Sequence, residues 1–244
     1  MNSRAGLIYA VTMKTRSLLA IGILGSAIAV SADLFLGYFP SGIHGFETAF
    51  TVDLDKVYTV LAQASHTRLL LSNYLAAVGI PLGWFGLFAI YRLLDNTTAL
   101  WPRLMLGIGT VGYVCGTLFH LSLSYIATAY REMLQVDGAT RSLLSEILEL
   151  FAAFSQPLAY VFLLASIVIS ILFAVLVFRG DTPLPRWMAG FNPLTIQIAL
   201  ALLAMILPLA TKTFVVISVY NFSLLLFYAG CLFVLRHQAH DDHR

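Results

Sequence analysis

The sequence predicts an all-α membrane protein, a polytopic bundle of six transmembrane helices with an amphipathic helix on the membrane surface. Its 244 residues are 59% hydrophobic and only 11% charged, and the mean hydropathy is +0.87. Such a composition is typical of multi-pass membrane proteins and excludes an ordinary soluble domain. Apolar runs of bilayer-spanning length recur along the chain with only short polar stretches between them. We therefore treat residues 1–244 as a single membrane domain.

Six apolar runs are the predicted membrane spans. In chain order they cover residues 17–39, 68–94, 103–128, 146–178, 194–210 and 213–235. Pro81 should kink the second span, because proline removes a helical hydrogen bond. The fourth span is longer than one perpendicular crossing needs, so it should tilt or project beyond the bilayer. The stretch between the fourth and fifth spans holds three prolines and is expected to form an interfacial loop.

An amphipathic helix is predicted over about residues 47–64, between the first and second spans. Its apolar residues recur at helical spacing, and its charged residues fall on the opposite side. The apolar set is Phe50, Leu54, Val57, Tyr58 and Leu61, and the charged set is Asp53, Asp55 and Lys56. A helix of this kind lies in the plane of the membrane surface, where it could cover a pocket as a lid.

The distribution of basic residues predicts the orientation. Six spans place both termini on one side, and nine of the 14 Lys and Arg residues fall on that side against five on the other. Basic residues favour the cytoplasmic side of a membrane. The expected location is therefore the plasma (inner) membrane, with both termini cytoplasmic.

Polar side chains from five spans are expected to share one layer near the outer face. They are Asp33, Arg68, Asn73, His120, Glu149 and Asn221. A carboxylate inside an apolar span is costly and needs a partner or a function. Asp33 and His120 lie on the same helical faces as glycines and other small residues, which point toward neighbouring helices in membrane bundles. The pattern predicts a polar pocket that opens outward.

The residues of this pocket suggest acid/base chemistry on an amphiphile. A carboxylate beside an imidazole can exchange protons, so Asp33 and His120 are the candidate catalytic pair. Arg68 could hold a phosphate or carboxylate headgroup, and Asn73, Glu149 and Asn221 are candidate substrate-binding residues. The leading hypothesis is a membrane-embedded enzyme or binder acting on a lipid-like or isoprenoid-like molecule.

Two other functions remain open from the sequence. A small-molecule transporter would need polar residues that continue to the inner face, whereas the inner halves of the spans are almost purely apolar. A structural or partner-binding bundle would use the polar layer only for packing, with Asp33 paired to Arg68. The sequence contains no G-x-S-x-G, S-x-x-K or P-loop motif, so serine-hydrolase and nucleotide chemistry have no support.

No cofactor is predicted. A divalent metal such as zinc is an alternative, with His44, His66, His120 and Asp33 as ligands, but these residues lack the regular spacing of known zinc motifs. Scattered charge gives no basic patch for nucleic acid. The expected partners are membrane lipids, a small amphiphilic ligand and, through glycine-rich helix faces, a second copy of the chain.

Short motifs along nearly the whole chain resemble an uncharacterised family of bacterial six-span integral membrane proteins, a domain of unknown function. They are Ala32-Asp33-Leu34, Pro40-Ser41-Gly42, Arg68-Leu69-Leu70, Gly79 to Gly86, His120, Pro185-Arg186-Trp187, Phe191-Asn192-Pro193, Pro208 and Asn221. The resemblance implies the six-span fold and a joint role for these positions, and it implies no activity.

Overall fold

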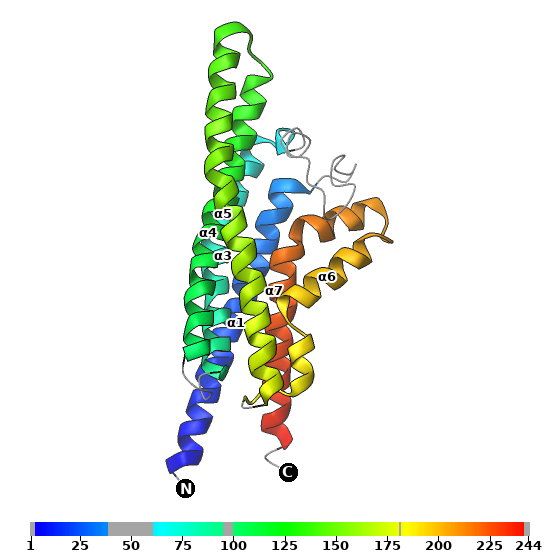
Figure 1. Cartoon of the computed structure of the whole chain (residues 1–244). Coiled ribbons are helices and arrows are strands. Elements are labelled where there is room, and N and C mark those ends of the chain that lie inside the picture. Colours follow the sequence, from blue (N-terminus) through cyan, green and yellow to red (C-terminus); the bar gives the residue numbers. More distant parts are fainter. Residues whose placement is uncertain (1–2, 39–60, 95–99, 181, 242–244) are drawn as a thin grey trace.

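The computed structural model describes residues 3–38, 61–94, 100–180 and 182–241, and these residues form helices and no strand. Figure 1 shows a bundle of long, roughly parallel helices with both chain termini at the same end. The long helices are α1 (Ser3–Gly37), α3 (His66–Leu94), α4 (Leu100–Met133), α5 (Gly138–Arg179) and α7 (Leu209–Asp241). Two shorter helices, η1 (Arg186–Gly190) and α6 (Pro193–Ala204), lie between α5 and α7.

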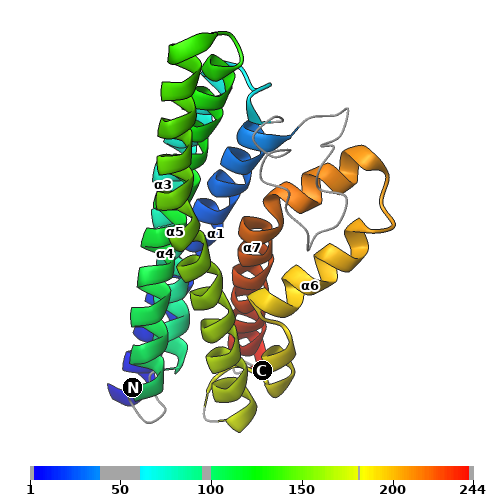
Figure 2. The same cartoon turned by 45° about the horizontal axis from the view of Figure 1, so that its top comes forward.

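Five helices in the described part of the chain are long and apolar enough to cross a membrane. Their outward surfaces are apolar as well, since Val111, Leu164 and Phe178 are exposed on α4 and α5. In water such a surface would be unfavourable, whereas lipid tails cover it without cost. The structure therefore shows the all-helical fold expected from the sequence, with five helices in its described part that suit a membrane. α1 packs between α3 and α7, and α4 packs between α3 and α5 (Figures 1 and 2).

The predicted count of six spans is not confirmed, because α6 is short. It has 12 residues, about 18 Å of helix, whereas the apolar core of a bilayer is about 30 Å thick. The fifth span was predicted to run to residue 210, but the helix ends at Ala204, and Pro208 lies just before α7 begins at Leu209. The predicted surface helix over 47–64 falls mainly on residues 39–60, which lie outside the described residues.

The segment between α5 and α6 differs from the expected interfacial loop. It forms the short helix η1, which packs against α5, and the side chains of Leu184 and Met188 are buried in the core. Asn192 then caps α6 by accepting a hydrogen bond from the backbone N–H of Thr195. Burial of the two apolar side chains draws this segment inward, despite its prolines.

The helices α4 and α5 extend farther from the terminal end of the bundle than the others do (Figure 1). The third and fourth predicted spans end at residue 128 and begin at residue 146, yet α4 continues to Met133 and α5 begins at Gly138. Gly138 has a φ of 63° at the connecting turn, a conformation that favours glycine. With 42 residues, α5 is about 63 Å long, in agreement with the predicted projection of the fourth span.

Glycines bring the backbones of α1 and α3 into direct contact. A Cβ atom added at Gly25 would lie 2.5 Å from the carbonyl carbon of Leu82, and one at Gly22 would lie 2.5 Å from the Cα of Gly86. These distances are shorter than van der Waals contact and involve backbone, which cannot move aside easily. The small residues on the Asp33 face of α1 were expected to point toward a neighbouring helix, and the structure shows that this helix is α3.

We expect Gly25→Ala to lower the free energy of unfolding by about 1–3 kcal/mol, because the added methyl group would push α1 away from α3. Gly107→Ala is the matched control, since nothing lies within 4 Å of a Cβ at that exposed position of α4. Denaturant-induced unfolding in detergent micelles would measure both. Equal stability of the two variants would contradict the close contact.

Candidate functional site

Asp33 joins three helices at the centre of the site. It lies near the end of α1 and is only 8% exposed. The side-chain amide of Asn221 on α7 donates a hydrogen bond to its Oδ2 over 2.8 Å. The Nδ1 of His120 on α4 lies 3.4 Å from its Oδ1. Three of the predicted site residues therefore meet, although they are far apart in the sequence.

Ser72 on α3 completes the polar chain. Its hydroxyl lies 3.1 Å from Nε2 of His120 and donates a hydrogen bond to the carbonyl oxygen of Ala32 over 2.8 Å. Ser72 is fully buried and was not among the predicted site residues. Gly79 and Gly86 follow Ser72 by seven and fourteen residues, so all three lie on the face of α3 that packs against α1. This spacing is the feature of the sequence from which Ser72 could have been predicted.

The proton positions in this chain follow from the number of donors. A serine has one hydroxyl proton, and Ser72 gives it to Ala32, so Nε2 of His120 must carry the proton that bonds to Ser72. Nδ1 of His120 faces Oδ1 of Asp33 over 3.4 Å. A proton held on either of these two atoms would therefore lie between the two side chains.

A cavity of about 230 Å³ lies beside this polar chain. Asp33, His120 and Asn221 belong to its wall, and the rest of the wall is mainly apolar and aromatic. The wall comes from α1, α3, α4, α5 and α7 and from Leu61, before α3. Along α4 the lining residues run from Gly109 to Leu123, about 21 Å of helix. The cavity is therefore elongated along the bundle.

Three further hydroxyl groups line the cavity and were not predicted from the sequence. They belong to Tyr113, Ser166 and Tyr220. Tyr113 is fixed by the hydroxyl of Tyr228, 2.7 Å away, and by the carbonyl oxygen of Gly83, 3.2 Å away. The buried Ser166 hydroxyl makes no hydrogen bond of ordinary geometry within the described part of the chain. Tyrosine and serine are common in membrane helices, so nothing in their spacing distinguished these positions.

Arg68 has a different role from the predicted one. Its guanidinium donates hydrogen bonds to the carbonyl oxygens of Phe35 and Tyr38, over 3.1 and 2.9 Å, and to that of Leu34 over 3.3 Å. The Leu34 carbonyl oxygen also accepts a hydrogen bond from the backbone N–H of Tyr38 over 3.0 Å. Carbonyl groups in the last turn of a helix lack a full set of intrahelical donors, so Arg68 caps α1. It is not among the described residues that line the cavity. His120 and Asn221 hold Asp33 in place of the expected Arg68.

Asn73 and Glu149 also lie away from the cavity wall. Asn73 accepts a hydrogen bond from the Ser124 hydroxyl over 2.7 Å and so joins α3 to α4. Glu149 is exposed on α5, contrary to the expectation that its face points inward. The face of α5 that lines the cavity instead carries Ala165, Ser166 and Ile169.

The structure does not gather the alternative metal ligands. His66 is exposed at the first residue of α3, and His44 lies outside the described residues. No group of three His, Cys, Asp or Glu side chains suited to a metal ion occurs among residues that the structure describes. Of the three members of the proposed set that the structure describes, Asp33 and His120 come together and His66 does not.

The fold and the cavity define a class: an all-helical membrane bundle with an internal, mainly apolar cavity and a buried acid–histidine pair on its wall. The chain belongs to a family of unknown function, DUF6796, whose sequence model matches residues 1–238. This confirms the resemblance to an uncharacterised family over nearly the whole chain. Comparisons with curated proteins and with solved structures gave no significant match.

Proposed function

We propose that the protein binds a lipid-like amphiphile inside the membrane and uses Asp33 and His120 as an acid/base pair on it. The observation that carries this proposal is the position of the pair on the wall of an elongated apolar cavity. An apolar cavity of about 150 Å³ is large enough to hold benzene. The cavity beside Asp33 is larger, at about 230 Å³, and suits an apolar chain with one polar end.

The chemistry available to the pair is proton transfer. Nδ1 of His120 lies 3.4 Å from Oδ1 of Asp33, and Asn221 and Ser72 hold the two side chains in position. A polar group of a bound molecule near Asp33 could take a proton from this pair or return one, which is the role of a general acid or base. Acid/base chemistry of this kind would make the protein an enzyme.

The ligand is proposed to enter from the lipid between α5 and α7. Phe162 of α5 and Tyr220 of α7 both line the cavity, and their ring centroids are 4.1 Å apart. Side-chain rotation of two rings requires no movement of the backbone. The seam between these helices could therefore open and close for a lipid chain.

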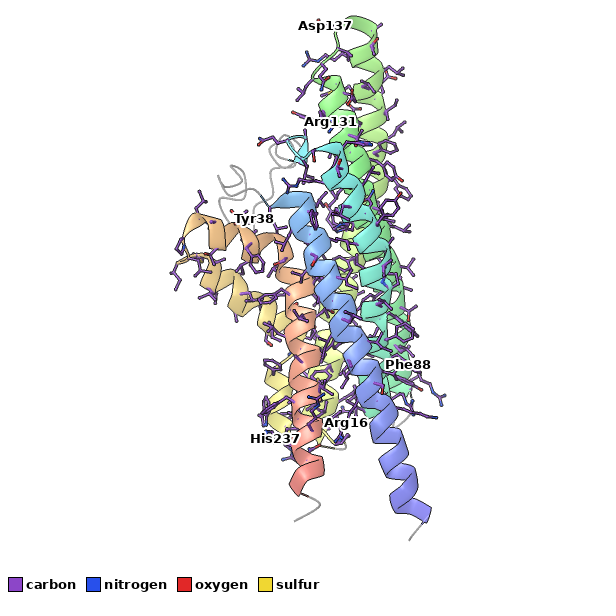
Figure 3. All side chains as sticks on the ribbon, turned by 180° about the vertical axis from the view of Figure 1, so that it is seen from behind. Arg16, Tyr38, Phe88, Arg131, Asp137 and His237 are labelled. Carbon is purple, nitrogen blue, oxygen red and sulfur yellow. The ribbon has the colours of Figure 1, made fainter. Side chains whose placement is uncertain are left out.

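The proposed setting is the plasma membrane, with both termini in the cytoplasm and six crossings. Arg16 and His237 lie at the same end of the bundle, opposite Tyr38 and Arg131 (Figure 3). Arg16 also donates a hydrogen bond to the carbonyl oxygen of Leu235, which ties the first and last helices together. In this orientation the fifth crossing is made jointly by η1 and α6, and the basic side of the chain faces inward.

Transport and purely structural roles receive less support. A transporter needs a path to the inner face, but the core between the cavity and the terminal end, which includes Leu87, Phe173 and Tyr228, encloses only a small second cavity of about 20 Å³. A purely structural polar layer would leave no void beside Asp33. The cavity therefore favours ligand binding.

Filling the cavity should abolish ligand binding. Val216 on α7 lines the cavity, so we expect Val216→Phe to remove at least nine-tenths of any amphiphile that copurifies with the protein in polymer nanodiscs, as measured by lipid mass spectrometry. Val161→Phe on α5 is the matched control, because Val161 is 40% exposed on the outer surface and does not line the cavity. Equal ligand retention by both variants, or no bound amphiphile in the parent protein, would contradict the proposed function.

A further inference from the structure

The charges on the cavity wall limit which headgroup the cavity can accept. Besides tyrosines, Asp33 and His120 are the only ionisable groups among the described residues that line it, and none of these residues is Lys or Arg. Arg68, which was predicted to bind an anionic headgroup, instead donates hydrogen bonds to the carbonyl oxygens at the end of α1. A phosphate or carboxylate head would therefore enter a low-dielectric site without a free cation to pair with it.

A cationic head is also disfavoured. The Asp33 carboxyl group faces His120 at 3.4 Å and accepts a hydrogen bond from Asn221. An ammonium group would have to displace one of these partners before it could pair with Asp33. The described part of the wall thus offers no unpaired charged group of either sign.

The wall does offer hydrogen bonds to an uncharged group. Asn221 uses its amide nitrogen on Asp33 and keeps its carbonyl oxygen as an acceptor, and each carboxylate oxygen retains a second lone pair. The buried hydroxyl of Ser166 interacts with the Tyr220 side chain and, like any hydroxyl, can both donate and accept a hydrogen bond. A hydroxyl head, which donates one hydrogen bond and accepts others, matches this set of groups.

We infer that the ligand is a single-chain amphiphile with an uncharged hydroxyl head, such as a long-chain alcohol, and that the site rejects the same chain carrying a phosphate. This inference rests on the proposed function, since it names the class of molecule that the cavity takes. The polar head lies beside Asp33 and Asn221, and the chain runs along α4 toward Gly109.

The test is a competition among three probes that share one chain: dodecanol, dodecyl phosphate and dodecylamine. Each displaces radiolabelled dodecanol from the full-length protein in lipid nanodiscs. We expect dodecanol to bind at least tenfold more tightly than either charged probe. Asp33→Asn removes the one acidic side chain among the described lining residues, which would lie beside the phosphate, and should reduce the difference between alcohol and phosphate to less than threefold. Glu149→Gln, which neutralises an exposed acid away from the cavity, should leave the preference unchanged.

The outcomes separate this inference from the proposed function. Tighter binding of the phosphate or of the amine by the parent protein would overturn the neutral-head assignment while leaving the binding of amphiphiles intact. Binding of none of the three probes, together with no amphiphile in the purified protein, would overturn both. Since the comparison of probes uses the unmodified protein, it does not depend on whether Asp33→Asn folds.

Discussion

Asp33→Ala and His120→Ala are each expected to lower the free energy of unfolding by about 3–5 kcal/mol, because each leaves a buried polar partner without its counterpart. Asp33 and His120 are 8% and 6% exposed, so water cannot replace the lost contact. Removing Asp33 also leaves the Asn221 amide without its acceptor. Removing His120 leaves Ser72 without the Nε2 donor.

A double-mutant cycle tests whether the two residues act as a pair. The variant that carries both alanines should be destabilised by at least 1 kcal/mol less than the sum of the single variants, since the second change removes a group that is already unpaired. Asp33→Asn keeps an acceptor oxygen and should be milder than Asp33→Ala. Unfolding in detergent with increasing denaturant gives all the values. Additive effects would show that the two side chains do not interact.

The second large effect is expected at Tyr228, in the core below the cavity. We expect Tyr228→Ala to lower the free energy of unfolding by about 3–5 kcal/mol, because it leaves a void where a buried aromatic ring was packed. The side chain is 1% exposed, and its ring lies so close to Gly86 that a Cβ there would be 2.6 Å from Cζ. It also bonds to Tyr113 on the cavity wall.

Tyr228→Phe is the matched control. It retains the ring and loses only the hydroxyl, and Tyr113 keeps the carbonyl oxygen of Gly83 as a partner, so the expected cost is about 1 kcal/mol. Thermal unfolding of the two variants in the same detergent measures the difference. A small effect of Tyr228→Ala would mean that this region is loosely packed, which would revive the transporter hypothesis.

Local patterns in the sequence predicted much of the fold. Hydropathy located the five long helices, and the small residues at helical spacing predicted that the Asp33 face of α1 contacts a neighbouring helix, which is α3. The length of α6 was overestimated. Residues 205–210 are as apolar as the helix that precedes them, and the hydropathy pattern does not show where a proline ends the crossing. The burial of Leu184 and Met188 depends on packing against α5, which composition does not encode.

The candidate site was predicted in part. Asp33, His120 and Asn221 were found because polar groups are rare inside apolar spans, and similar depth was enough to bring them together. Depth alone does not show which way a side chain points, and for this reason Glu149 was placed in the pocket although it is exposed. From the sequence, Arg68 was expected to hold a ligand headgroup. Its partners are instead three backbone carbonyl oxygens at the end of α1, and no residue pattern reveals partners of that kind.

The most direct test of the central claim is an experimental structure of the protein in lipid nanodiscs, solved for the parent chain and for Val216→Phe. We predict elongated non-protein density between α1, α4 and α7 in the parent, with one end within hydrogen-bonding distance of Asp33 or Asn221, and no such density in Val216→Phe. A closed bundle whose side chains fill the cavity in the parent protein would contradict the claim.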